Sequence, residues 1–137
     1  MKMKEKSFDV PLISIVDDDL SVRRSAKRLL RTVGLRAEAF GSAEEFLASG
    51  LVDESACLIL DLCMPGMNGL QLQLRLAEEG RRIPIIFLTA HFSPEEERQA
   101  LKAGAVKFLQ KPVNKDVLLL AIRQILKPPL HDERKIT

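Results

Sequence analysis

The sequence alternates between short apolar runs and longer segments whose apolar residues recur at helical spacing. This alternation is typical of parallel strands joined by helices, because a parallel neighbour cannot be reached through a tight turn. The runs are short and bounded by polar residues, glycines or prolines, which favours buried strands over helices. The predicted strands cover residues 12–16, 36–40, 57–60, 85–88 and 106–109.

Start and stop signals bound the helical segments between these runs. Asp19 or Ser21 is a suitable N-cap after the first strand, and Gly34 ends the helix that follows. Ser42 with Glu45 has the spacing of a capping box. Ser93 and Glu96 repeat that spacing around Pro94, and the helix they begin is unusually polar over 95–99. We expect that helix to be weakly packed or to await a partner.

Five strands and five helices in strict alternation predict an α/β fold with a doubly wound parallel sheet. Because crossover connections are right-handed, few topologies remain, and the flavodoxin-like (βα)5 arrangement with strand order 2-1-3-4-5 is expected. We predict one domain over residues 11–127, preceded by an extension over 1–10 and followed by a frayed polar tail over 128–137 after Pro128-Pro129. No repeat or second domain is predicted.

Composition excludes several classes of function. The 21 basic and 19 acidic residues nearly balance, so electrostatics gives no argument for direct contact with nucleic acid. Trp and Tyr are absent, which removes the usual platforms for stacking bases. No apolar run approaches a bilayer span, and the first ten residues lack the apolar segment of a signal peptide. Cys57 and Cys63 lack metal-type spacing, so we predict a reduced protein in the cytoplasm, away from membranes.

Polar side chains follow four of the predicted strands. Asp17, Asp18 and Asp19 follow the first strand, and Asp61 follows the third; Thr89 and Lys111 follow the fourth and fifth. The ligand site of such a sheet lies beyond the carboxyl ends of its strands, so the fold gathers carboxylates, a hydroxyl and an ammonium there. Each residue taken singly has a plain structural explanation as a cap, a turn residue or a solvated charge. Their joint placement favours a functional site.

This set of groups suits magnesium-assisted phosphoryl transfer. Crowded carboxylates repel one another, and Mg²⁺ relieves that repulsion while leaving coordination positions for water and phosphoryl oxygens. A carboxylate can act as a nucleophile and form an aspartyl phosphate. A metal ion, a lysine and a hydroxyl are the groups that stabilise the charge on a transferring phosphoryl group.

The motifs carrying these residues closely resemble the response regulator receiver domain of two-component signalling. The resemblance covers about residues 11–127, and the stretches 42–47 and 103–105 are similar to receivers of the nitrogen-fixation transcription-factor type. The matching segments, in order, are Val16-Asp17-Asp18-Asp19, Leu60-Asp61-Leu62-Cys63-Met64-Pro65-Gly66-Met67-Asn68-Gly69, Leu88-Thr89-Ala90, Ala103-Gly104-Ala105 and Phe108-Leu109-Gln110-Lys111-Pro112.

The resemblance implies a role for each matching residue of the site. Asp61 is the implied phosphoacceptor, and Asp18, Asp61 and the backbone carbonyl of Cys63 are the implied direct Mg²⁺ ligands. Asp17 is expected to reach the metal through water. Lys111 is expected to pair with the phosphoryl group, through a loop whose bond to Pro112 is cis. No other cofactor is implied.

The resemblance also implies a conformational switch. Thr89 is expected to hydrogen-bond a phosphoryl oxygen, with Ala90 as the small residue beside the nucleophile and Phe108 changing rotamer together with Thr89. Cys63 and His91 occupy positions where the family varies phosphoryl lifetime. The chain is then a signalling switch, not an enzyme acting on other substrates.

The implied partners are a sensor histidine kinase or a histidine phosphotransfer protein. The implied output face comprises the fourth helix, predicted over 94–103, the Phe108 strand and the fifth helix, and it is a candidate for dimerisation. The fifth helix is indicated by the helical spacing of Leu118, Ala121, Ile122 and Ile125. The sequence leaves open whether the chain is a stand-alone receiver or part of a longer regulator.

Three other readings explain the acidic motif less well. A haloacid-dehalogenase-type phosphatase also uses aspartate and Mg²⁺, but it needs Gly-Thr after the second acid and leaves Asp61 unexplained. A flavodoxin-like cofactor binder needs a phosphate loop after the first strand, where three aspartates repel phosphate, and the GxxxxGK[ST] nucleotide loop is also absent. A scaffold that no longer takes phosphate should lack an acid, Thr89 or Lys111, and none is missing.

Overall fold

The structure, a computed structural model, describes residues 10–127. The predicted extension, apart from Val10, and the predicted tail lie outside this range. Five strands form one parallel sheet in the order β2-β1-β3-β4-β5, which confirms the predicted flavodoxin-like topology. The strands are β1 Leu12–Val16, β2 Arg36–Phe40, β3 Ser55–Asp61, β4 Ile85–Thr89 and β5 Lys107–Gln110.

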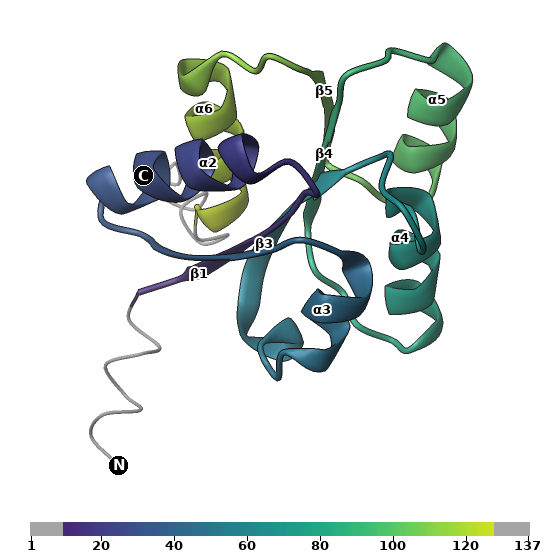
Figure 1. Ribbon diagram of the computed structural model, residues 1–137, viewed down its shortest axis with the longest axis horizontal. Helices are drawn as coiled ribbons and strands as arrows, with labels where there is room; N and C mark the ends of the chain where they lie inside the picture. Colours follow the sequence, from purple (N-terminus) through teal and green to yellow (C-terminus); the bar gives the residue numbers. More distant parts are fainter. Residues whose placement is uncertain (1–9, 128–137) are drawn as a thin grey trace, which may run out of the picture.

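Helices cover both faces of this sheet (Figure 1). One face carries α2 and α6, and the other carries α3, α4 and α5. Successive side chains of a strand point to opposite faces, so both faces of β3 are apolar: Cys57 and Ile59 face α2 and α6, while Leu58 and Leu60 face the other layer. The helices are α2 Leu20–Thr32, α3 Ala43–Ala48, α4 Gly69–Glu78, α5 Pro94–Lys102 and α6 Lys115–Leu126, with a 3-10 turn over Val52–Glu54.

The helices begin at side-chain caps, most of them where the sequence predicts. Asp19 caps α2 by accepting from the Ser21 N–H at 2.9 Å. Ser42 caps α3, but the returning Glu45 carboxylate accepts from the Gly41 N–H at 2.6 Å, so this box is displaced by one residue. The complete capping box is at α4, between Asn68 and Gln71, a pair that the sequence reading did not single out.

Gly69 lets α4 start directly against the end of β3. Its N–H donates to the Leu62 carbonyl at 3.0 Å. A Cβ at this position would lie 2.5 Å from the Asp61 carbonyl oxygen and 3.0 Å from the Phe87 ring. Backbone and a buried ring cannot yield as a flexible side chain can, so this close approach requires glycine.

We expect Gly69→Ala to lower the free energy of unfolding by about 1–3 kcal/mol, because the added methyl overpacks the junction of β3 and α4. Urea melts followed by circular dichroism measure the loss. Gly41→Ala is the matched control, since a Cβ at Gly41 would lie 3.4 Å from its nearest neighbour, the Arg23 guanidinium. Equal losses in the two variants would contradict the packing argument.

Candidate functional site

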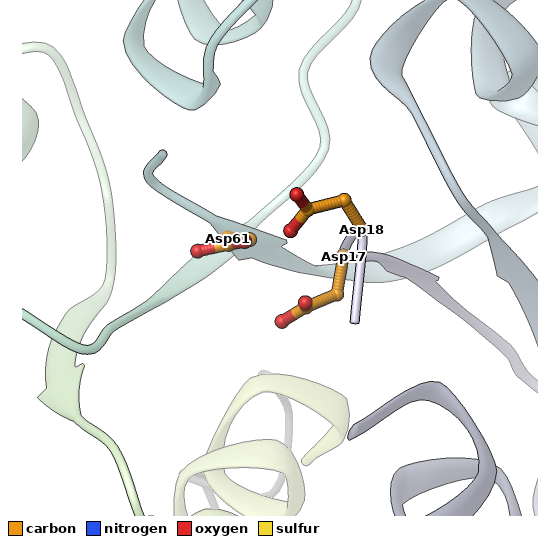
Figure 2. Close-up of side chains that lie close together, drawn as sticks. All are labelled: Asp17, Asp18 and Asp61. Atoms are coloured by element: carbon orange, nitrogen blue, oxygen red, sulfur yellow. The ribbon is translucent and has the colours of Figure 1, made fainter. Parts of the chain in front are cut away.

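Three carboxyl groups meet at the carboxyl edge of the sheet (Figure 2). Asp17 and Asp18 follow β1, and Asp61 is the last residue of the neighbouring strand β3. Each offers an oxygen, and these oxygens lie within 4.8 Å of one another. Asp17 and Asp61 are buried, whereas Asp18 is exposed, so the cluster opens to solvent on the Asp18 side. The structure therefore brings the three predicted acids together.

Lys111 is the cation that faces these acids. Its Nζ lies 2.8 Å from Asp17 Oδ2 and 3.5 Å from Asp61 Oδ1. The other Asp17 oxygen accepts from the Asp19 N–H at 2.9 Å, so both oxygens of Asp17 have partners within the protein. The Lys111-Pro112 bond is cis, as the resemblance implies. Burial lowers the Lys111 pKa, but the hydrogen bond and charge of Asp17 outweigh it and leave the pKa raised.

Asp61 occupies the least favourable position for a negative charge. Its residue surface is 4% exposed, and burial together with the charge of Asp17 raises its pKa to about 7. Lys111 and the Cys63 N–H, 3.4 Å from Asp61 Oδ1, act in the opposite direction but do not cancel the effect. Any cation that enters the cluster would therefore stabilise the charged form of this carboxyl group.

The Thr89 hydroxyl is turned toward its own loop. It donates to the His91 carbonyl at 3.0 Å and accepts from the His91 N–H at 3.2 Å. Thr89 is 1% exposed at the end of β4, and β4 pairs with β3 so that Leu88 lies beside Asp61. The hydroxyl therefore lies at the predicted edge, and contact with a group on Asp61 requires it to leave His91. Ala90 and His91 are both exposed at this edge.

The loop between β3 and α4 carries Cys63 and is held from α3. Glu44 Oε2 accepts a hydrogen bond from the Met67 N–H at 3.1 Å. The preceding residue, Gly66, lies next to this carboxylate and has a positive φ of 76°. Partial desolvation and the charges of Glu96 and Asp61 raise the pKa of the exposed Cys63 thiol, so it is not an activated nucleophile. The sequence reading missed Glu44, because a residue 23 positions from Met67 gives no local signal.

Phe108, on β5, lies between two other aromatic rings. Its ring centroid is 6.0 Å from that of the buried Phe87 and 6.5 Å from that of Phe92. Phe92 is 50% exposed and meets Phe108 edge-on at 76°. Phe108 itself is half-buried against the core beneath α5. The predicted switch residue thus sits at the rim of the core, where a change of rotamer would alter the surface.

The donor set suits a small hard cation. Carboxylate oxygens from two adjacent strand ends converge, one acid is exposed, and the buried pair is short of positive charge. Mg²⁺ is usually bound by one or two carboxylates together with waters and phosphoryl oxygens, which this open cluster can accommodate. The residues present therefore fit a divalent metal beside a nucleophilic carboxylate.

A doubly wound α/β domain with acids, a hydroxyl and a lysine at one sheet edge has the architecture of a phosphoryl-dependent switch. Residues 13–123 match the family described as the response regulator receiver domain. The chain belongs to this family, and the haloacid-dehalogenase-type phosphatase is not favoured.

Named relatives place the chain among two-component regulators. It is 46% identical over 111 residues to nodulation protein W of Bradyrhizobium diazoefficiens, covering 81% of this chain and 49% of that protein. It is 42% identical over 125 residues to the response regulator protein TodT of Pseudomonas putida, covering 91% and 55%. The crystal structure of FixJ-N superposes with a TM-score of 0.75 at 34% identity, over 84% of this chain and 92% of that one.

These relatives confirm the predicted receiver family, including relatives of the nitrogen-fixation type. The chain spans about half the length of the curated relatives it matches. Within residues 10–127, no helix has the length and apolar character needed to cross a bilayer.

The raised pKa of Asp61 predicts a pH-dependent instability of the metal-free protein. Because the pKa of Asp61 is about 7 in the folded state, the folded protein holds this proton up to about pH 7, whereas the unfolded chain loses it near the ordinary aspartate pKa of 3.8. Stability therefore falls as pH rises between these values. We expect Asp61→Asn in EDTA to be about 2 kcal/mol more stable than wild type at pH 8, with little difference at pH 3.5. Urea melts across this range, with the exposed Asp53→Asn as control, measure the change. A constant difference at all pH values would contradict it.

Proposed function

We propose that Asp61 accepts a phosphoryl group from a phosphohistidine of a sensor kinase or phosphotransfer protein, in a reaction that requires Mg²⁺. The observation that supports this most strongly is the buried Asp61 carboxylate, grouped with two other acids and 3.5 Å from the Lys111 ammonium. Few purely structural arrangements would place three acids and one lysine at one edge of a sheet, where repulsion among the acids lowers stability.

In this reaction an Asp61 carboxylate oxygen attacks phosphorus while the P–N bond to the donor imidazole breaks. The electron pair of that bond leaves with the imidazole nitrogen. Asp18, Asp61 and the Cys63 carbonyl would hold Mg²⁺ directly, with Asp17 acting through water, and the bound metal would offset negative charge on the phosphoryl oxygens. Lys111, already within 3.5 Å of Asp61, would pair with one of those oxygens.

Thr89 and Phe108 would carry the change to the surface. A phosphoryl oxygen on Asp61 offers the Thr89 hydroxyl an acceptor in place of the His91 carbonyl, 3.0 Å away in the present state. Movement of Thr89 would open space into which Phe108 could turn from its place between Phe87 and Phe92. The phosphoryl group need only favour the inward state by a few kcal/mol, roughly the size of a typical population shift.

The face formed by α5, β5 and α6 is the proposed output surface. Apolar side chains are exposed along it, with Leu101 and Val106 at 43% and 42% and Leu120 at 56%. The first turn of α5 is acidic, whereas α6 carries the exposed bases Lys115 and Arg123. A second receiver or an effector partner would bury the apolar residues, and the charges would set its orientation more than its affinity.

The wider assignments follow from the receiver family. We infer a switch that acts on its own aspartate and not on other substrates, in which residues 11–127 form the receiver. The cytoplasm is the proposed compartment, supported by two free cysteines, Cys57 and Cys63. No direct contact of this domain with nucleic acid is proposed.

Phosphorylation by acetyl phosphate tests the assigned chemistry. We expect wild type to gain about 80 Da by intact mass spectrometry only when Mg²⁺ or Mn²⁺ is present, because the transferred group replaces one hydrogen. Asp61→Asn should show no gain, and Asp18→Asn should need roughly tenfold or more Mg²⁺. Asp53→Asn, an exposed acid far from the cluster, is the control. A full mass gain in Asp61→Asn would show that another residue is the acceptor.

Beryllofluoride, which mimics a phosphoryl group on the acceptor aspartate, tests the output face. With Mg²⁺ and beryllofluoride, we expect NMR shifts to extend from the acidic site to Phe108 and the exposed apolar residues, and sedimentation to show increased self-association. Leu120→Lys should reduce that association without affecting beryllofluoride binding, because a charge replaces an exposed apolar contact. Shifts confined to the strand ends, without association, would reject this face and leave the site chemistry standing.

A further inference from the structure

Gln73 is a buried amide that the phosphoryl chemistry does not use. It lies one turn into α4 and is 4% exposed. Its Nε2 donates to the Ala100 carbonyl at 3.0 Å, a side chain to backbone bond that spans 27 residues. Burying an amide is unfavourable unless it is hydrogen-bonded. The Gln73 amide meets this requirement through its bond to α5, at a buried position that an apolar side chain could also fill.

The rest of α5 is held weakly. Among its nine described residues, Ala100 is the buried one, at 0% exposure, and it lies in the last turn. The first turn is acidic and solvated, and its cap is Ser93, two residues after His91. The N-terminal end of α5 therefore adjoins the Thr89 loop with little packing to fix it. The C-terminal end carries both the apolar contact and the Gln73 bond.

An open cleft lies beside this bond, lined by the C-terminal part of α4, residues 80–85 and the turn that joins α5 to β5. It has a volume of about 490 Å³, and Gln73, Leu76, Ile83 and Val106 are among its lining residues. Close packing around the turn that follows α5 is therefore incomplete beside the bond. The Ala100 carbonyl also accepts from the Ala105 N–H at 3.0 Å, so the Gln73 bond is made at the point where α5 ends and the chain turns toward β5.

Gln73 is itself well placed relative to the phosphoacceptor. Its helix begins at Gly69, which donates to Leu62 immediately after Asp61 and cannot accept a larger residue. The start of α4 is thereby fixed against β3. Gln73 extends this fixed structure sideways to α5, the helix that follows the strand carrying Thr89.

We propose that Gln73 is a positioning residue that anchors the C-terminal turn of α5 to α4, so that α5 moves about this end when the Thr89 loop changes. The anchor is a property of the unphosphorylated structure, and the movement rests on the proposed function. The N-terminal half of α5 is the mobile end, and its acidic turn travels furthest. Output is then a tilt of one helix about a hydrogen-bonded pivot.

Amide hydrogen exchange of the metal-free protein tests the anchor. Gln73→Leu keeps the side-chain volume but removes the donor, and Gln73→Met is a second variant in case the branched residue fits badly. We expect exchange of the Ala103, Gly104 and Ala105 amides, which close the last turn of α5, to rise about fivefold relative to wild type, the change that corresponds to a hydrogen bond of about 1 kcal/mol. Exchange in α2 and α6 should rise less.

Ser14→Ala is the matched control. It removes another buried hydrogen bond, between Ser14 Oγ and Ser55 Oγ at 2.7 Å, within the sheet and away from α5. General destabilisation would raise exchange at the end of α5 in this variant as well. An equal rise in the Ser14 and Gln73 variants, or no rise in either Gln73 variant, would overturn the anchor.

A second experiment tests the pivot: Mg²⁺ and beryllofluoride are added, and the NMR chemical shifts of the backbone amides are followed along α5. In wild type and Ser14→Ala we expect larger shifts over 95–98, the residues after Pro94, than over 101–105. In Gln73→Leu the shifts over 101–105 should at least double, because that end is no longer held. The same profile in all three proteins would overturn the pivot. A wild-type α5 that does not respond would also overturn the pivot and would count against the proposed output, while the exchange result would still decide the anchor.

Discussion

The repulsion among Asp17, Asp18 and Asp61 is the constraint on which the rest of the site depends. Parallel pairing of β1 with β3 puts these acids at one edge, and burial of two of them prevents water from screening their charges. One ammonium, from Lys111, offsets part of this repulsion and binds Asp17 more closely than Asp61. Asp61, the carboxyl group with the more distant ammonium, has a raised pKa and is also the proposed nucleophile. Metal binding and phosphoryl acceptance both act on the Asp61 carboxyl group, whose negative charge the fold leaves only partly compensated.

The sequence was sufficient to predict the sheet and the side chains that gather at its carboxyl edge, because both depend on short-range patterns. A buried parallel strand reads as an apolar run, and the residue after it must lie at the carboxyl edge. Strand ends were less accurate. β3 begins at Ser55, two residues before the predicted start, where the Ser55 hydroxyl is hydrogen-bonded to the Ser14 hydroxyl of β1. β5 covers Lys107–Gln110, one residue later than predicted, and it is a half-exposed edge strand whose burial pattern is weak.

Individual hydrogen bonds between distant helices and loops could not be predicted. The bond from Gln73 to Ala100 and the bond from the Met67 N–H to Glu44 both join residues more than 20 positions apart, and neither follows a local spacing rule. The displaced box at α3 shows the same limit on a smaller scale, since Ser42 and Glu45 have the right spacing but the carboxylate reaches Gly41. Pattern reading identifies which groups a loop contains, whereas the partner that each group finds depends on how the helices pack.

The solvated first half of α5 has a consequence for how such a domain diversifies. Side chains over residues 94–99 are exposed or only partly buried, so most substitutions there should change stability by roughly half a kcal/mol or less. At the acidic edge, by contrast, burial and close ion pairs constrain both the geometry and the charges. New recognition sequences can therefore arise on this half of the helix without loss of the folded domain, and a lineage of duplicated regulators could acquire separate partners while keeping one input chemistry. Insulation between parallel signalling pathways would then require few changes to the rest of the chain.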